Sequence, residues 1–216
     1  MAHEKHYPHI GRKEQPLDPA AWEERYRAGD TPWDHGEASP GLLDFLSEQK
    51  YAPGTVLVPG CGAGHDCRAL ARRGFTVTGV DISKLALERA GKLAKREQLP
   101  IRYEQADCLH PPAGWKGAFD WVFEHTCFCA IDPDLRDDYV GAVRFVLPSG
   151  GHLLGVFFNI QPEKGPPFGT TREELMDRFG PHFALELEEV PRSFPNRTGE
   201  ELLLLWRKKV NRFVAL

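Results

Sequence analysis

The stretch VPGCGAGHD, residues 58–66, decides the fold. It follows a short apolar run that begins at Thr55, which is typical of a buried strand, and it leads into a helical pattern over residues 67–73. Glycines between a strand and a helix let the backbone turn tightly and approach a ligand, with the helix N-terminus behind it. The stretch therefore predicts a strand–turn–helix unit with a ligand site at its turn.

The alternation of strand and helix patterns continues on both sides of this stretch. We expect strands at residues 55–58, 75–80, 101–106, 118–123, 152–158, 184–190 and 202–208, and helices at 22–28, 42–49, 67–73, 83–96, 136–146 and 171–180. This order indicates an α/β fold with a mostly parallel sheet. The last two strands have no helix between them, which favours an antiparallel hairpin at the sheet edge.

Length, charge and cysteine content narrow the class of protein. The 216 residues suffice for one domain, expected at residues 20–216 behind a flexible N-terminal arm at residues 1–19. The formal charge of -4 argues against nucleic-acid and anionic-membrane partners, which select basic surfaces. The sequence has no apolar run of ~18 residues, and its first residues lack an apolar stretch, so we expect no membrane-spanning helix and no secretory signal. Five cysteines, an odd number, predict reduced thiols and a cytoplasmic location.

Two acids follow the next two strands at the edge where the glycine turn is expected. Asp81 lies about 20 residues after Gly60, and an acid at this spacing can accept hydrogen bonds from both ribose hydroxyls. Asp107 ends the third strand, where it can accept from an adenine amino group while the amide of Cys108 meets a ring nitrogen. The alternative for Asp107 is a turn cap. Gly60, Gly62, Asp81, Asp107 and Cys108 are therefore candidate binding residues.

The glycine spacing restricts the nucleotide-like ligand. A dinucleotide fingerprint reads G-x-G-x-x-G, whereas this stretch reads G-x-G-x-G with His65 at the third glycine position. Tight helix packing around a pyrophosphate is therefore disfavoured. S-adenosylmethionine carries a ribose and an adenine but no phosphate, and it is compatible with this loop.

Aromatic side chains gather ahead of the first strand. Trp22 and Tyr26 are spaced to share a helix face, and Trp33 follows them. Such rings can belong to the core, or they can form a lid that shields a sulfonium cation and its acceptor from water. The composition of the segment leaves both interpretations open.

Several separate motifs together resemble the thiopurine S-methyltransferase superfamily, and within it most closely the thiol and halide methyltransferase branch. The motifs lie at residues 22–36, 57–66, 79–83, 128–133 with Arg136, 165–168 and 206–209. The resemblance implies a Rossmann-like class I methyltransferase fold with a seven-stranded sheet, S-adenosylmethionine as cofactor, and a small-molecule methyl acceptor. It also implies a monomer.

The resemblance carries site residues onto this chain one by one. It implies that Trp22, Tyr26 and Trp33 cover the cofactor, that Gly60 lies in its loop, that Asp81 binds the ribose, and that Asp107 and Cys108 bind the adenine. His125 matches a position near the methionine part. His125 stands where related proteins tend to carry tyrosine, and Tyr26 stands where tryptophan is frequent. Both departures bear on acceptor preference.

The acceptor pocket and the catalytic groups are less determined. Trp33, Phe128 and Phe168 are expected to contact the acceptor, with the loop at residues 159–169 as a cover. A soft anion needs little or no general base, whereas a neutral thiol would be helped by Asp34, His125 or Arg136. For Arg136 a surface charge at a helix start is an equally good interpretation. His125, Cys127 and Cys129 could suggest a metal site, but no further ligand pair completes it, so we expect no metal.

Two other functions compete with a methyltransferase. A NAD-dependent oxidoreductase is disfavoured by His65 in place of the third glycine. A non-enzymatic S-adenosylmethionine-binding module is disfavoured by the intact glycine turn and the aromatic segment. Neither composition nor spacing identifies the acceptor.

Overall fold

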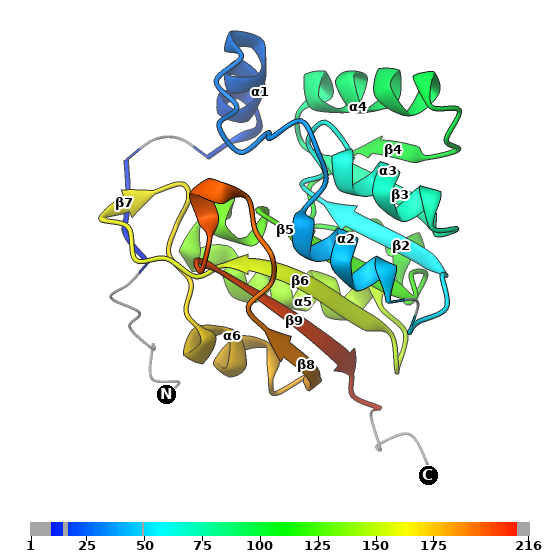
Figure 1. The fold of residues 1–216 in the computed structure, drawn as a ribbon. Coiled ribbons are helices and arrows are strands. Elements are labelled where there is room, and N and C mark those ends of the chain that lie inside the picture. The colour runs from blue at the N-terminus through cyan, green and yellow to red at the C-terminus, as the bar shows by residue number, and fades with distance from the viewer. Residues whose placement is uncertain (1–9, 15–16, 49, 211–216) are drawn as a thin grey trace.

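The computed structural model describes residues 10–14, 17–48 and 50–210, and a seven-stranded sheet runs through them (Figure 1). The strand order is β4-β3-β2-β5-β6-β9-β8. Every pair from β4 to β6 is parallel, and β9 runs antiparallel to both of its neighbours. The strands are β2 (Thr55–Pro59), β3 (Thr76–Asp81), β4 (Arg102–Gln105), β5 (Trp121–His125), β6 (His152–Phe158), β8 (Phe183–Glu189) and β9 (Glu201–Lys208). The α/β class, the seven strands and the antiparallel last pair are confirmed.

Helices cover both faces of the sheet, as Figure 1 shows. Alternate strand residues point to opposite faces, so Leu57 packs with α5 and α6 while Val56 and Val58 pack with α2 and α3. Both faces are thus buried, which explains the nearly continuous apolar character of the central strands. The helices are α1 (Pro19–Ala28), α2 (Pro40–Ser47), α3 (His65–Arg72), α4 (Lys84–Arg96), α5 (Arg136–Val146) and α6 (Arg172–Phe179).

Side-chain caps stand at the starts of three helices, of which α1 begins at Pro19 rather than at the expected residue 22. Asp18 accepts from the amide of Ala21 at 2.9 Å at the start of α1. Ser83 accepts from Ala86 at 3.1 Å at the start of α4, and Thr171 accepts from Glu174 at 3.2 Å at the start of α6. Each cap satisfies an amide that the first helical turn leaves free, which fixes where these helices begin.

The N-terminal arm is described only in part, because residues 1–9 and 15–16 lie outside the described residues. Strand β1 (Arg12–Lys13) pairs in parallel with β7 (Lys164–Gly165) in the loop after β6. Lys13 donates to Asp132 at 2.5 Å. These described residues of the arm therefore lie against the domain.

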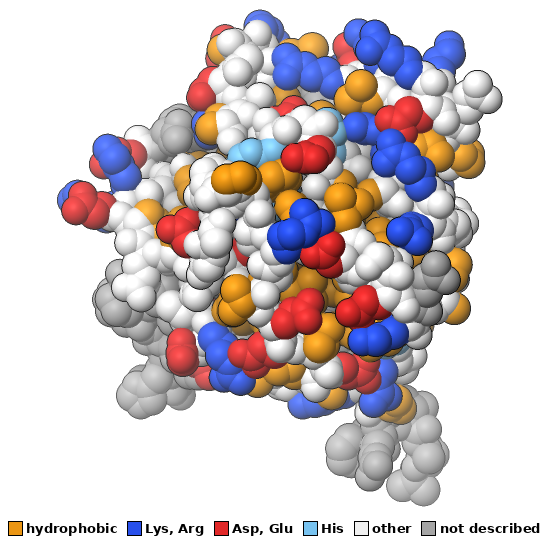
Figure 2. Space-filling view, viewed as in Figure 1, with side chains coloured by type: hydrophobic (Ala, Val, Ile, Leu, Met, Phe, Trp, Pro, Cys, Tyr) orange, Lys and Arg blue, Asp and Glu red, His pale blue; other side chains and the backbone are white. Residues whose placement is uncertain are grey.

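The described residues contain no helix long and apolar enough to cross a membrane. Figure 2 shows acidic and basic side chains interspersed over one face of the molecule. Strands β2 and β5 are neighbours in the middle of the sheet. The sheet continues from β2 to β3 and β4 on one side, and from β5 to β6 on the other. Ligands of open α/β sheets bind outside the carboxyl ends of the strands at such a point.

Candidate functional site

A cavity of about 700 Å³ opens at the carboxyl ends of the parallel strands. Its wall receives residues from the β2–β3–β4 half of the sheet and from the β5–β6–β9 half. Helix α1 and the residues after it contribute the cover. The volume lies within the range of pockets that enclose a small-molecule ligand.

The glycine turn after β2 is fixed by Asp81 at the end of β3. One Asp81 oxygen accepts from the amide of Gly62 at 2.9 Å, and the other accepts from Ser83 at 2.9 Å. Burial raises the pKa of Asp81, and these amide donors oppose that rise. Each carboxylate oxygen has a second lone pair, so Asp81 can still accept from ligand hydroxyls at the cavity wall.

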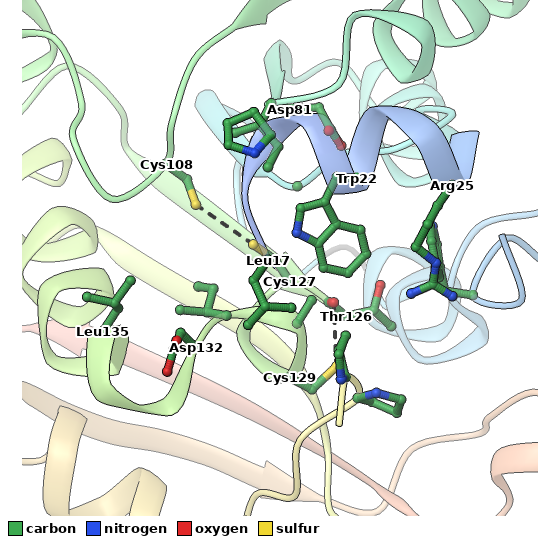
Figure 3. A pocket seen from close by; sticks show the side chains of 18 of the residues that line it. Leu17, Trp22, Arg25, Asp81, Cys108, Thr126, Cys127, Cys129, Asp132 and Leu135 are labelled. Atoms are coloured by element: carbon green, nitrogen blue, oxygen red, sulfur yellow. Dashed lines mark hydrogen bonds between the residues drawn. The ribbon is translucent and has the colours of Figure 1, made fainter. Parts of the chain in front are cut away.

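Gly60 lets the turn pass close to the residues that follow β5. Its φ is +57°, and a Cβ there would lie 2.9 Å from the Cβ and Sγ of Cys127. Cys127 lines the cavity and lies 3.9 Å from Cys108, sulfur to sulfur (Figure 3). A side chain at Gly60 would therefore clash with Cys127 and displace this part of the cavity wall.

The β4 side of the cavity combines an apolar slot with Asp107. Ile82, Cys108 and Leu109 line it. Asp107 also lies on the wall, where its carboxylate accepts from the amide of Leu109 at 2.9 Å and contacts the His110 ring at 2.7 Å. The turn-cap interpretation of Asp107 and a place at the cavity are thus compatible.

Three aromatic rings cover the cavity from the N-terminal segment. Trp33 packs edge-on against Trp22 and Tyr26, with ring centroids 5.5 and 5.7 Å away, and its indole donates to the Tyr26 hydroxyl at 3.3 Å. The Arg25 guanidinium lies 4.5 Å from the Trp33 ring centroid. Figure 3 shows the Trp22 indole projecting from α1 toward the cavity. Burial and the nearby Asp81 raise the pKa of Tyr26, so its phenol stays protonated.

The other half of the cavity has a buried cation on its wall. Arg197, in the short helix η4 (Pro195–Arg197), is 6% exposed, and its guanidinium lies 4.8 Å from the ring centroid of Phe158. Its Nη1 is 3.3 Å from the Glu201 carboxylate. Thr126, Cys129 and Asp132 after β5, and Pro166 and Pro167 after β7, also line this half.

The structure brings most of the predicted cofactor residues to one cavity. The wall includes Trp22, Tyr26, Trp33, Gly60, Asp81, Asp107 and Cys108. Gly62 lies just behind the wall, where a Cβ would come 3.0 Å from the Tyr26 hydroxyl. His125 also lies behind the wall, with its Nδ1 2.9 Å from the Asp66 carboxylate.

Asp34 points toward α3 rather than toward the cavity. Its Oδ1 lies 2.9 Å from Nε2 of His65, whose other ring nitrogen is 2.7 Å from the Arg68 guanidinium. The His65 contact lowers the pKa of Asp34 against the opposing effect of burial. A carboxyl held ionised in this way is a weaker base.

Arg136, Phe128 and Phe168 lie in the protein interior, outside the cavity wall. Arg136 is fully buried, donates to Glu174 at 2.9 Å and to the Gly169 carbonyl at 2.9 Å, and lies 4.5 Å from the Phe128 ring centroid. Phe128 packs among the α5 and α6 core residues, and Phe168 lies against Gly165. Arg136 is therefore not the surface charge that its helix-start position allowed.

The cavity fits the cofactor that the sequence resemblance implies. An acid with free lone pairs, an apolar slot and an aromatic cover match the ribose, adenine and sulfonium of S-adenosylmethionine. Among the described residues, no three or more His, Cys, Asp or Glu side chains gather as a metal ion would require.

Sequence reasoning missed Arg197 and Phe158 in the second half of the cavity, whereas Pro166 and Pro167 lie in the loop at residues 159–169 that was expected to cover the acceptor. Arg197 lies in a segment that reads as a long connection between two edge strands. Phe158 has no spacing that marks it as a site residue. A cation flanked by prolines and glycine just before an apolar strand is the one available signal for Arg197.

Comparison with known proteins gives a consistent result. The family model for thiopurine S-methyltransferase matches residues 17–208. Thiocyanate methyltransferase 1 of Brassica oleracea is 32% identical over 200 residues, covering 89% of this chain and 86% of that protein. Probable thiol methyltransferase 2 of Arabidopsis thaliana is 33% identical over 192 residues, covering 87% and 84%.

A solved structure agrees on the fold. The 1,6-didemethyltoxoflavin-N1-methyltransferase of Burkholderia thailandensis, crystallised with S-adenosylhomocysteine, has a TM-score of 0.74 at 21% identity and covers 93% of this chain and 95% of its own.

Proposed function

The chain belongs to the thiopurine S-methyltransferase family and is an S-adenosylmethionine-dependent methyltransferase, and we propose that its acceptor is a small, soft nucleophile. Thiocyanate, halides, small thiols and thiopurines are the acceptors in this class. The observation that carries the proposal is the buried Arg197 guanidinium on the β5–β6–β9 side of the cavity. A cation there favours an acceptor that arrives as an anion.

The cofactor-binding half of the proposal uses the β2–β3–β4 side. Asp81 accepts from the ribose hydroxyls, the slot beside Asp107 and Cys108 holds the adenine, and the turn at Gly60 and Gly62 approaches the rest of the molecule. When bound, S-adenosylmethionine supplies a methyl group on a positively charged sulfur that is already activated toward nucleophiles. Trp22, Tyr26 and Trp33 exclude water from this region.

The acceptor half of the proposal needs alignment more than proton transfer. A thiolate, halide or thiocyanate has its nucleophilic lone pair available, so orientation next to the donor supplies most of the rate. Arg197 holds the anion, with Trp33 and Phe158 as apolar walls. The pairing of Asp34 with His65 argues against Asp34 as a base. Arg136, Phe128 and Phe168 support the wall from the core.

A product assay tests this function. The protein is incubated with S-adenosylmethionine carrying a ¹³C-methyl group and with thiocyanate, iodide, hydrosulfide, a thiopurine, or selenium and tellurium oxyanions, and the methylated products are detected by mass. We expect labelled product from at least one soft anion. Cofactor binding without any labelled product would favour the binding-module alternative. A thermal shift with NAD but none with S-adenosylhomocysteine would favour the oxidoreductase.

We also propose that the protein acts as a monomer in the cytoplasm. The five cysteines are free thiols in the structure, which supports a reducing compartment. Light scattering behind a sizing column gives the oligomeric state, and a mass twice that of one 24.3 kDa chain would contradict the monomer.

A further inference from the structure

Four charged groups, two of them buried and two partly buried, form a chain of alternating sign that ends at the cavity. The Asp66 carboxylate on α3 lies 2.9 Å from Nδ1 of His125 at the end of β5. Nε2 of His125 lies 3.9 Å from Oε1 of Glu201 on β9, and the same oxygen lies 3.3 Å from Nη1 of Arg197. Of these four residues, only Arg197 lies on the cavity wall.

The protonation states of the chain follow from its contacts. Burial opposes a charge on His125, but Asp66 and Glu201 outweigh it and raise the pKa of His125 to about 9. Burial would raise the pKa of Glu201, but His125, Ser193 and Arg197 lower it overall. At neutral pH the four groups thus carry two positive and two negative charges.

We propose that His125 is a positioning residue, which draws the Glu201 carboxylate toward itself and so leaves the Arg197 guanidinium facing the cavity to receive the acceptor anion. The proposal rests on the soft-anion function given above. It concerns a side chain that the family resemblance marks as a departure, and it gives His125 a role without contact to the reacting atoms.

The geometry explains why a cation is needed beside Glu201. A carboxylate and a guanidinium pair most strongly through two parallel hydrogen bonds, yet Glu201 and Arg197 share one contact of 3.3 Å. The side chains of His125 and Glu201 are 9% and 1% exposed, so water screens their charges little. Without the His125 charge, Glu201 would pair with Arg197 alone. The four groups would then carry one net negative charge beside the site of an anion.

Three further ionisable groups face this cluster. Burial raises the pKa of the Cys129 thiol, which shares the cavity wall with Arg197, to about 12, so this thiol stays protonated up to pH 10. His35, which stacks on Phe194 at 4.0 Å, has a pKa lowered by burial and by Arg197 and His125, so it is neutral at pH 7 and above. Glu124, next to His125 on β5, has a pKa raised by burial. Its carboxylate accepts hydrogen bonds from the amides of Cys127 and Phe128 and from the Tyr139 hydroxyl. A variant at position 125 separates the titration of His125 from theirs.

The test is an equilibrium measurement that needs no turnover. Thiocyanate carries the same charge throughout pH 6–10, so any change in its affinity reports on the protein and on the bound S-adenosylhomocysteine, whose α-amino group is present equally in every variant. Its dissociation constant for the S-adenosylhomocysteine complex is obtained from line broadening of ¹³C-labelled thiocyanate. For the unchanged protein we expect a constant value from pH 6 to 8 and about tenfold weaker binding by pH 10.

The His125→Asn protein should bind thiocyanate about tenfold more weakly at pH 7. Its dissociation constant should also lose the step, which is the rise of about tenfold between pH 8 and pH 10. The double variant His125→Asn, Glu201→Gln removes one charge of each sign and should recover most of the affinity at pH 7. His152→Asn is the matched control, since His152 on β6 also faces a carboxylate, with its Nε2 3.4 Å from Glu186, but has a pKa lowered by burial and lies outside the cavity wall.

The outcomes separate this inference from the proposed function. A step that persists in His125→Asn, or an unchanged protein without a step, overturns the role of His125 alone. Failure of thiocyanate to bind at any pH, while S-adenosylhomocysteine binds normally, overturns the soft-anion function and this inference with it. If His125→Asn does not fold, the double variant and the pH profile of the unchanged protein still decide the question.

Discussion

The Asp81 carboxylate accepts a hydrogen bond from the Gly62 amide at 2.9 Å, so the acid at the end of β3 holds the glycine turn that follows β2. Asp81 ends β3 and Gly62 follows the end of β2, and these two strands are parallel neighbours whose carboxyl ends share one edge of the sheet. The same side chain is thus able to fix the loop and to face the cavity. This relationship joins the fold to the cofactor site.

Asp81→Asn should weaken binding of S-adenosylhomocysteine by about 10–100-fold, which corresponds to about 1.5–3 kcal/mol for charge-assisted hydrogen bonds. The amide keeps the size of the side chain but loses the negative charge and one set of acceptor lone pairs. Isothermal titration calorimetry measures the change. Asp44→Asn, at an exposed acid paired with Arg192, should leave the affinity as it is. Unchanged affinity in a folded Asp81→Asn protein would remove the ribose role.

Trp33→Ala should lower kcat/KM about tenfold or more, because the ring shields the reaction from water. Its edge-on contacts with Trp22 and Tyr26 limit the stability cost to about 1–2 kcal/mol. Steady-state kinetics and urea unfolding measure the two effects. Trp115→Ala is the matched control, because Trp115 is also half-buried and packs edge-on against Phe119 outside the cavity wall. A variant with normal kcat/KM and poor stability would show that Trp33 is a core residue and not part of the cover.

Arg136→Met should destabilise the protein by about 3–5 kcal/mol, since it leaves the buried Glu174 carboxylate without this cation. The effect should appear in urea unfolding and not in the affinity for S-adenosylhomocysteine per folded molecule. Arg172→Met, which removes an exposed partner of Glu188, should change stability little. A large loss of acceptor affinity with normal stability would instead place Arg136 in the reaction.

His125 should contribute a pH-dependent part of the stability. Its folded pKa of about 9 exceeds the ordinary 6.5, so the native state binds the proton more tightly than the unfolded state. The contribution is therefore complete below about pH 6.5 and is lost as the pH rises toward 9, at most about 3 kcal/mol. The unfolding free energy of the unchanged protein minus that of His125→Asn should fall across this window. A difference that stays flat with pH would mean that the two pKa values of His125 coincide.

The sequence was most informative where local pattern and topology suffice. Apolar runs and the rule that parallel strands end at one edge predicted the fold and brought Asp81 to the glycine turn. The second half of the cavity depends on contacts between distant segments. Arg197 reaches the wall only because β9 inserts between β6 and β8.

The directions in which side chains point were the second feature of the site that the sequence did not predict. Phe128 and Arg136 follow β5 closely in sequence, yet both point into the α5–α6 core, because neither follows a regular period that would show its face. The family resemblance assigned His125 to the ligand. Its partners Asp66 and Glu201 lie 59 and 76 positions away (125 − 66 and 201 − 125), which no local pattern reveals.

The most direct test of the account is a crystal structure of the protein with S-adenosylhomocysteine and thiocyanate. We predict the ribose hydroxyls at the Asp81 carboxylate, the adenine between Ile82 and Leu109, and the thiocyanate at the Arg197 guanidinium under Trp33. Nucleoside density away from Asp81, or thiocyanate bound only elsewhere, would contradict the account.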